Sequence, residues 1–399
     1  MEERISTLIE LFDRRQDDNV IAAAVIKPEK VVFLCPREVP QVVRDGIRGF
    51  IRSQSEDTGV SFASVDLDDP AKVAEKLESV LQGRGGGVID ITGGGEAAAF
   101  AAGMVCAENH IPVISYDYDL QRFVNIRGAY FLDGMTERFR MSLRDTFRIA
   151  GGTVDGYGRI SPGEIEEWLP DIERVWQVFR GHNRVWQKFT AWMQYAVSIA
   201  RQNGDITKIS APREAGRSAG KVKTNISILR ELRSRKLISR LSRDGETVSF
   251  TFKNEKLAAL MCDAGVWLEL YCWVGCLRSG IFDDCASSVV VKWPEREAGS
   301  KTVTHNELDC VAVRWPVKLF ISCKLSVPTA QALNEIKTLT SRFAGVGGKA
   351  VLMTMGDAAR DRFFSQRAAD LHIGIIDRST LMSADPDALP KRLMELAGM

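Results

Sequence analysis

Short apolar runs alternate with amphipathic helical patterns along the first 130 residues of the chain. The runs KVVFLC, VSFASVD, VIDIT and PVISYD have the length and apolar content of buried strands. Between them, apolar residues recur at helical spacing over residues 40–53, 70–82 and 96–109. Strands that alternate with helices form a parallel sheet covered by helices. The pattern therefore predicts an α/β domain over residues 1–150.

The pattern changes after residue 150, where helical spacing continues without strand-like runs. SPGE at residues 161–164 is a capping box with proline at the first helical position, which predicts the start of a helix. Four tryptophans follow on this stretch: Trp168, Trp176, Trp186 and Trp192. We expect them to pack in a core or against another subunit. Residues 151–204 are thus predicted to be a helical connector.

A basic segment comes next, over residues 205–253. From Lys208 to Arg243 the chain has eleven lysines and arginines but only two acids, Glu214 and Glu231. An amphipathic helix is followed here by two strand-like runs joined around Asp244 and Gly245, a hairpin turn signal. This order predicts a winged-helix domain. Its charge is consistent with nucleic-acid contact and equally with a solvated basic surface.

Residues 254–399 return to an alternating pattern and are predicted to form a second α/β domain. An apolar helix precedes the runs VVVKW, LDCVAV and KLFISCK, and helical patterns over 329–343 and 357–371 flank KAVLMT and precede IGIID. A chain of 399 residues exceeds what one core usually organises, so several domains are expected.

The composition is that of an ordinary globular protein, with 45% hydrophobic and 26% charged residues. A formal net charge of +1 means that a nucleic-acid partner would have to bind a local basic patch. The N-terminal residues MEERISTLIELFDRR do not resemble a signal peptide or an anchor, and no stretch has the ~20 apolar residues of a membrane span. We therefore expect no membrane partner.

The eight cysteines lie mostly in apolar runs and form no CxxC pair, which indicates the reducing cytoplasm. Cys272 and Cys276 have helical spacing, but their apolar neighbours favour small core residues over a zinc site.

Residues 306–324, NELDCVAVRWPVKLFISCK, predict a hairpin that carries acids and a lysine. Side chains alternate along a strand, so Glu307 and Asp309 share one face. Beyond a turn at Trp315 and Pro316, Ser322 and Lys324 also share a face. If the two faces coincide, the lysine lies near two carboxylates. Carboxylates that bind Mg²⁺ and a neighbouring lysine are the groups needed to hydrolyse a phosphodiester.

Glu269 is the only charged residue in VWLELYCWVGCL, residues 266–277. A buried lone carboxylate is unfavourable unless it is paired or binds a metal. Two interpretations stay open for Glu269: a third acid of the site, or a residue on an exposed stripe of the helix. For Glu307 taken alone, an ordinary surface acid is the simpler interpretation.

The hairpin and the segment ALNEIKTLTSRFAGVGGKAVLMT that follows it resemble the PD-(D/E)xK nuclease core of CRISPR-associated Rossmann-fold (CARF) nucleases of the Card and Can type. The resemblance implies that Asp309 is the first metal-binding acid, Lys324 the catalytic lysine, and Glu269 the acid of the preceding helix. It also implies the backbone carbonyl of Cys323 as a metal ligand. The family usually has Glu or Asp where Ser322 stands, and Glu307 lies on the face that could supply the missing charge.

The run VIDITGGGEAAAFAAG resembles the strand, glycine turn and helix of a CARF domain. The turn is formed by Thr92, Gly93, Gly94 and Gly95, whose backbone N–H groups and helix N-terminus could face an anionic ligand. Glu96 departs from the family, where a basic or polar residue is commoner. Arg37 follows another strand at its carboxyl end, where ligands bind in open α/β sheets, and is a candidate phosphate contact or a plain surface arginine.

The order of a Rossmann-like CARF domain, a helical connector, a winged helix and a restriction-endonuclease-like α/β domain covers nearly the whole chain. The resemblance implies a homodimer of type III CRISPR antiviral defence that binds a cyclic oligoadenylate, with cyclic tetra-adenylate favoured. It implies an endonuclease, dependent on Mg²⁺ or Mn²⁺, that cleaves single-stranded DNA or RNA or nicks duplex DNA. The alternative is a ligand-responsive DNA-binding transcriptional regulator with an inactive nuclease fold. A nucleotide-using metabolic enzyme is disfavoured because no P-loop lysine or ribose-binding acid stands at the expected place in the first domain.

Overall fold

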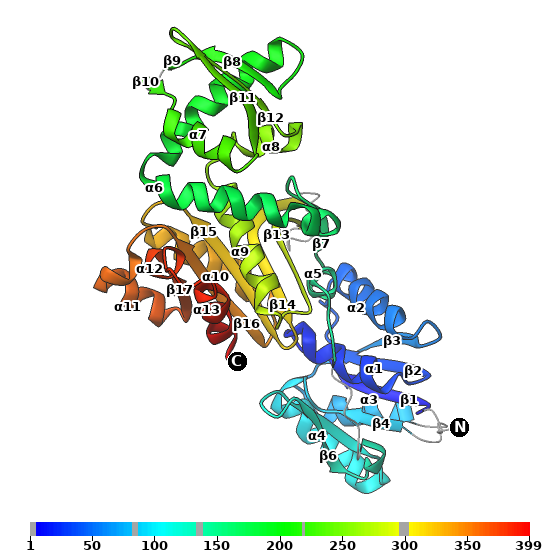
Figure 1. Ribbon diagram of the computed structural model, residues 1–399. Coiled ribbons are helices and arrows are strands. Elements are labelled where there is room, and N and C mark those ends of the chain that lie inside the picture. Colours follow the sequence, from blue (N-terminus) through cyan, green and yellow to red (C-terminus); the bar gives the residue numbers. More distant parts are fainter. Residues whose placement is uncertain (1–4, 82–86, 133–138, 218–219, 295–302) are drawn as a thin grey trace.

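The chain folds into three parts that follow one another along the molecule (Figure 1). The structure is a computed structural model that describes residues 5–81, 87–132, 139–217, 220–294 and 303–399. Two six-stranded sheets lie in the first and last parts of the sequence, and a three-stranded sheet lies between them in the sequence. This mixed α/β architecture agrees with the predicted fold class. Within the described ranges, no helix is both long and apolar enough to span a bilayer.

The first sheet has the strand order β3-β2-β1-β4-β5-β6. Its strands are β1 (Thr7–Leu11), β2 (Lys30–Cys35), β3 (Gly59–Ser64), β4 (Gly87–Asp90), β5 (Val113–Asp117) and β6 (Arg122–Arg127). All neighbouring pairs are parallel except β5 with β6. The helices of this part are α1 (Ile21–Ile26), α2 (Gln41–Gln54), α3 (Pro70–Leu81) and α4 (Gly95–Asn109). The predicted strands and helices between residues 30 and 117 are confirmed.

The central strand β1 was not predicted from the sequence. All five of its residues are buried, including Glu10. The carboxyl group of Glu10 lies beside that of Asp90, and its pKa is raised well above the usual range, first by burial and next by the charge of Asp90. Because Glu10 interrupts the apolar residues of TLIEL, this segment was not recognised as a buried strand.

The long helix α6 (Ile165–Gln202) lies between the C-terminal α/β part and the basic segment (Figure 1). It bends at His182. The predicted capping box is present at Ser161 and Glu164. All four tryptophans of this region are buried, so the expectation that they pack in the core is confirmed. The predicted connector also contains a strand, β7 (Thr153–Tyr157), which pairs with the C-terminal sheet. The helix α5 (Leu143–Ile149) precedes it.

The basic segment contains the predicted helix followed by a hairpin. Helix α7 (Ile226–Ser234) precedes β11 (Ile238–Asp244) and β12 (Thr247–Phe252), and Gly245 adopts a positive φ in the turn. β8 (Lys208–Pro212) completes a three-stranded sheet in the order β11-β12-β8. A short hairpin, β9 (Glu214–Arg217) and β10 (Gly220–Lys223), and helix α8 (Glu255–Leu260) complete this part.

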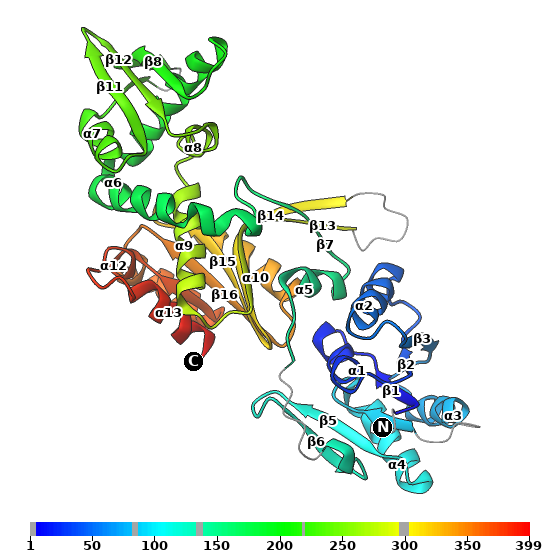
Figure 2. The same cartoon turned by 45° about the vertical axis from the view of Figure 1, so that its right-hand side comes forward.

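The second six-stranded sheet has the order β17-β16-β15-β14-β13-β7. Its further strands are β13 (Asp284–Pro294), β14 (Val303–Arg314), β15 (Val317–Lys324), β16 (Gly347–Thr354) and β17 (Ile373–Ile376). Its helices are α9 (Val266–Ser279), α10 (Ala330–Phe343), α11 (Arg362–Asp370), α12 (Arg378–Leu381) and α13 (Ala388–Ala397). Figure 2 shows α9 crossing the face of this sheet, and the apolar side chains of α9 lie in its core.

The turn of the β14–β15 hairpin is inserted into the core of the N-terminal part. The indole ring of Trp315 lies 4.7 Å from the ring of Phe139 and 5.2 Å from that of Tyr116, between ring centroids. Nearby, Nζ of Lys318 lies 2.6 Å and 2.7 Å from the carboxylate oxygens of Asp17 and donates to the carbonyl of Ala344. Both charged side chains are almost fully buried, with 1% and 0% exposure. The hairpin is thus held by both α/β parts.

Replacing Lys318 with Ala should destabilise the protein by about 3–5 kcal/mol, because the Asp17 carboxylate would stay buried without its cation. The measurement is the urea unfolding midpoint. The matched control is Lys391→Ala, which removes an exposed pair with Asp385 and should leave the midpoint nearly unchanged. Equal midpoints for the two variants would contradict this account of the interface.

Candidate active site

The β14–β15 hairpin brings Asp309 and Lys324 together. The antiparallel ladder pairs Cys310 with Ile321. In this register, Asp309 on β14 lies opposite Ser322 on β15. Lys324 Nζ lies 3.8 Å from Asp309 Oδ2. The same oxygen accepts hydrogen bonds from Ser322 Oγ at 3.1 Å and from the backbone N–H of Cys323 at 2.6 Å. The predicted convergence of these side chains is therefore present.

Glu269 reaches the same place from α9. Its Oε2 accepts a hydrogen bond of 2.8 Å from the hydroxyl of Ser288, on β13. The pKa of Glu269 is raised to about 8, mainly by desolvation and next by the negative charge of Asp309, while the bond from Ser288 acts in the opposite direction. Such repulsion requires the two carboxyl groups to be close. Glu269 is therefore a third acid of this cluster rather than part of an exposed stripe.

Glu307 stands two residues before Asp309 on β14, opposite Val290 of β13. Its side chain is exposed, and its charge also raises the pKa of Glu269. It lies near enough to add negative charge to the cluster, but it is the least enclosed of the three acids.

The acids have the chemistry of a hard-cation site. Among the hydrogen bonds between described residues, none goes to Asp309 Oδ1 or Glu269 Oε1. Two carboxylate oxygens without donors, in a cluster whose charges repel one another, suit Mg²⁺ or Mn²⁺, which prefer oxygen ligands. The Ser322 hydroxyl donates to Asp309 and so orients this carboxylate. That Ser322 and Glu307 act in catalysis, and that the Cys323 carbonyl binds metal, stay predictions.

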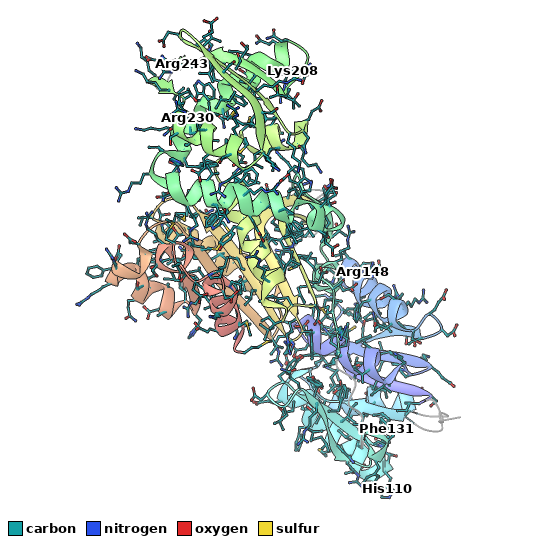
Figure 3. All side chains as sticks on the ribbon, viewed as in Figure 1. His110, Phe131, Arg148, Lys208, Arg230 and Arg243 are labelled. Atoms are coloured by element: carbon teal, nitrogen blue, oxygen red, sulfur yellow. The ribbon has the colours of Figure 1, made fainter. Side chains whose placement is uncertain are left out.

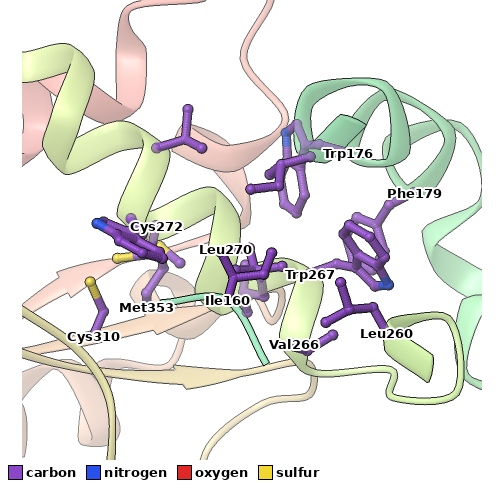
Figure 4. Close-up of a cluster of buried hydrophobic side chains, with 14 of the residues drawn as sticks. Ile160, Trp176, Phe179, Leu260, Val266, Trp267, Leu270, Cys272, Cys310 and Met353 are labelled. Carbon is purple, nitrogen blue, oxygen red and sulfur yellow. The ribbon is translucent and has the colours of Figure 1, made fainter. Parts of the chain in front are cut away.

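A cluster of cysteines lies behind the acids. The sulfur atoms of Cys272, Cys276 and Cys310 lie within 4.8 Å of one another, and all three side chains are buried among apolar neighbours (Figure 4). This burial confirms that Cys272 and Cys276 are core residues, and with Cys310 their thiols also form a group that could hold a metal ion. Thiols are soft ligands, so this cluster is chemically distinct from the oxygen site in front of it.

The glycine turn follows β4 at the point where the strand order of the first sheet reverses, between β1 and β4. The Thr92 hydroxyl faces inward: it bonds Asp90 and accepts from the backbone N–H of Tyr116 at 2.8 Å. A side chain on Gly94 would collide with Leu11, 2.4 Å from a Cβ built at that position, so only glycine fits this close approach. Gly95 has open space around it.

Two residues were missed from the sequence, one at the glycine turn and one at the cluster of acids. Asp13, just after β1, accepts a hydrogen bond of 3.3 Å from the N–H of Gly94, one of the donors expected to face an anionic ligand. Ser288, which donates a hydrogen bond to Glu269, has a positive φ within β13. Neither position has a local sequence signal, because each acts through a residue far away in the chain.

Arg37 follows β2, and β1 lies between β2 and the strand β4 that precedes the glycine turn. It is exposed and lines a hollow of about 650 Å³ at the ends of β2 and β3. Three basic residues (Arg37, Lys72 and Lys76) and three acids (Glu38, Asp66 and Glu75) line this hollow. Its charges are thus balanced, and a phosphate contact by Arg37 stays a prediction.

Comparisons with known proteins connect this geometry to two solved structures. No protein-family model and no curated protein matches the chain. The crystal structure of protein VC1899 from Vibrio cholerae matches with a TM-score of 0.72 at 16% sequence identity, over 98% of both chains. Can2 from Sulfobacillus thermosulfidooxidans, in complex with cyclic tetra-adenylate, matches with a TM-score of 0.65 at 19% identity, over 98% of this chain and 99% of that chain. The chain has the fold of these two proteins. At such identities the likeness extends to the architecture and does not assign an activity.

Because the pKa of Glu269 is about 8 in the metal-free protein, this carboxyl group is protonated below that pH. A cation needs the carboxylate, so the apparent Mn²⁺ affinity should fall by up to about tenfold per pH unit below 8. Calorimetric titration with Mn²⁺ at several pH values measures this. Glu269→Gln should bind weakly and lose this pH dependence, whereas Glu335→Gln on α10 should keep it. An unchanged pH dependence in Glu269→Gln would exclude Glu269 as a ligand.

Proposed function

We propose that this protein is a metal-dependent nuclease of type III CRISPR antiviral defence, activated by a cyclic oligoadenylate. Its substrate would be single-stranded nucleic acid, or duplex DNA that it nicks. The observation that carries the proposal is the convergence of Glu269, Asp309 and Lys324, from α9, β14 and β15. Two acids and a lysine around donor-free carboxylate oxygens are the groups that a phosphodiester hydrolase requires.

In this mechanism Asp309 and Glu269 would hold Mg²⁺ or Mn²⁺, and Glu307 would add negative charge. The bound cation would polarise the scissile phosphate and lower the pKa of a water. The hydroxyl of Ser322 and the N–H of Cys323 donate to Oδ2 of Asp309, so Oδ1 would be available to bind the cation. Lys324 is partly exposed beside these acids, so its ammonium group can orient the attacking water and stabilise negative charge on the phosphoryl oxygens.

The proposed activator is a cyclic oligoadenylate, with cyclic tetra-adenylate favoured because Can2, which shares the fold, was solved with that ligand. The glycine turn at residues 92–95 is the proposed contact, since it lies where the strand order reverses and Gly95 is open. Binding would shift a homodimer between two arrangements of the nuclease parts, which requires different ligand affinities for the two states.

The basic segment is the proposed contact for nucleic acid near the site. Arg230, Arg243 and Lys208 extend outward from it in Figure 3. Arg230 and Arg233 are exposed on α7, three residues apart, and Arg240 is exposed on β11. Cations on one helix and its neighbouring strand can bind successive backbone phosphates.

A ligand-responsive DNA-binding transcriptional regulator is the second candidate function. It is favoured by the same basic segment and by Ser322, whose hydroxyl is a weaker ligand for Mg²⁺ than the usual carboxylate. The two functions differ in one outcome, since a regulator binds duplex DNA at particular sequences and leaves it intact.

The central test is cleavage by the purified protein with Mn²⁺, cyclic tetra- or hexa-adenylate, and single- or double-stranded DNA or RNA. Lys324→Ala should abolish cleavage, because the water and the developing charge lose their cation, and should leave ligand affinity unchanged. Lys337→Ala, on α10 of the same domain, is the control and should cleave like the wild type. Persistent cleavage by Lys324→Ala would show that the active site is assigned wrongly, and intact DNA under every condition would favour the regulator.

The homodimer has support from an apolar surface on α4. In this helix, GEAAAFAAGMVCAEN, residues 97–107 are apolar or glycine on every side, and Phe100 and Met104 are 66% and 52% exposed. A helix that is apolar on all sides is normally buried on all sides. A second copy of the chain, related by a twofold axis, is the proposed cover.

Phe100→Asp should therefore change the mass in solution from twice 44.3 kDa toward 44.3 kDa, because a charge would be buried in the interface. Light scattering after size-exclusion chromatography measures the mass. Phe363→Asp, at an equally apolar but 92% exposed position on α11, is the control and should keep the wild-type mass. If both variants keep it, α4 does not form the interface.

A further inference from the structure

A small recess lies beside Lys324, beneath the long helix α6. Its volume is about 230 Å³. Four segments line it: α6 near its bend, the residues after β15, the end of β16 and the start of α12. The lining residues are Phe179, Asn183, Arg184, Trp186, Gln187, Leu325, Ser326, Met355 and Arg378.

The recess is fixed to the candidate active site through the backbone. Leu325 and Ser326 directly follow Lys324, and the N–H of Met355 donates to the carbonyl of Lys324 at 2.9 Å. The carbonyl of Ser326 accepts a hydrogen bond of 2.8 Å from the hydroxyl of Thr354, which pairs with Lys324 in the sheet. Two residues of chain span at most about 7 Å. Phosphates along one strand of duplex DNA are spaced by roughly 3.4 Å along the helix axis, so on a strand with this geometry the distance corresponds to about two nucleotides.

Two arginines face this recess without an opposing acid. None of its lining residues is Asp or Glu, in contrast to the charge-balanced hollow around Arg37. Arg184 is exposed, and within the described part of the chain it forms no ion pair or side-chain hydrogen bond. Arg378 also has no acidic partner there, so both guanidinium groups keep donors for an anion.

The arginine on α12 is oriented before any ligand arrives. Arg378 Nη1 donates to Asn183 Oδ1 at 3.0 Å, and Asn183 Nδ2 donates to the carbonyl of Arg180 at 2.8 Å. This connection bridges α12 and α6. The floor beneath it is rigid, because Trp186 and Phe179 are almost fully buried. A donor held in place loses little conformational freedom on binding.

The bend of α6 links the recess to the basic segment. At the bend, His182 Nε2 lies 3.0 Å from Glu231 Oε2 of α7, and Asn183 and Arg184 follow immediately. Figure 1 shows α6 passing between the nuclease-like sheet below and the basic segment above. A strand leaving the cluster of acids can thus meet the recess before it reaches α7.

We propose that this recess is a subsite for a backbone phosphate of the nucleic-acid substrate, within about two nucleotides of the scissile bond, held by Arg184 and Arg378. The inference rests on the proposed nuclease function. It specifies which residues would bind the nucleic-acid substrate next to the candidate active site. Guanidinium groups bind phosphate oxygens in bidentate fashion and stay charged at all physiological pH values. The recess is too small for a folded partner and is polar on two walls, which suits one phosphate and its sugar.

The test measures binding and cleavage with the full-length protein. Arg184→Gln and Arg378→Gln are made in the wild type and in the non-cleaving Lys324→Ala background, with Arg367→Gln on α11 as the control for loss of one exposed charge. Binding of a fluorescent single-stranded oligonucleotide is followed across salt concentrations. Each recess variant should bind about threefold to tenfold more weakly, and its salt slope should fall by about 0.7. KM should rise, with little change in kcat.

Arg378→Lys separates charge from structure. This variant keeps the positive charge but loses the guanidinium group that donates to Asn183. It should therefore retain most of the salt dependence of binding and unfold at the same urea midpoint as the wild type. Recess variants that bind and cleave like Arg367→Gln would overturn the subsite, as would a loss confined to kcat. Failure of the proposed function has a different signature: the wild type would bind the oligonucleotide without cleaving it. In that case the binding arm still decides the subsite, and a wild type that binds no nucleic acid overturns it.

Discussion

The structure depends on the β14–β15 hairpin, which is fixed at both of its ends. At the turn, Trp315 packs in the aromatic core of the N-terminal part and Lys318 forms its buried ion pair with Asp17. At the open end, the same two strands carry Asp309 and Lys324. Because side chains alternate along a strand, a slip of one residue would turn the acid and the lysine to opposite faces. The packing that fixes the turn therefore also fixes the positions of Asp309 and Lys324 at the site.

Electrostatic repulsion is the second constraint. Burial and, next to it, the charge of the nearby Asp309 raise the pKa of Glu269, while Lys324 Nζ lies 3.8 Å from Asp309 Oδ2. Such an arrangement is unfavourable for folding and is retained where a cation can complete it. The hydrogen bonds from Ser288, Ser322 and the N–H of Cys323 keep the carboxylates oriented. Residue 322 is a serine rather than an acid, and its hydroxyl positions the carboxylate of Asp309.

The two α/β parts differ in how they present charge. In the N-terminal part, acids lie close to the glycine turn, and Asp13 binds the N–H of Gly94. In the C-terminal part, Glu269, Asp309 and Glu307 lie in one cluster. The charged residues that line the adjacent recess are both arginines. A net charge of +1 conceals this separation. Local fields, rather than the overall charge, decide where an anionic polymer can approach.

The sequence alone determined the elements whose signals are local: alternating runs for β2 to β5, the capping box before α6, and the turns at Trp315–Pro316 and Gly245. Side-chain alternation also sufficed to place Glu307 with Asp309 and Ser322 with Lys324, because it depends only on strand geometry. Tertiary structure decided the rest. Contacts between residues far apart in the chain give Glu269 its partner, bury Glu10 in β1, place Arg37 at a charge-balanced hollow and form the recess beside Lys324. Such contacts depend on how elements pack, and packing has no signature within a short window of sequence.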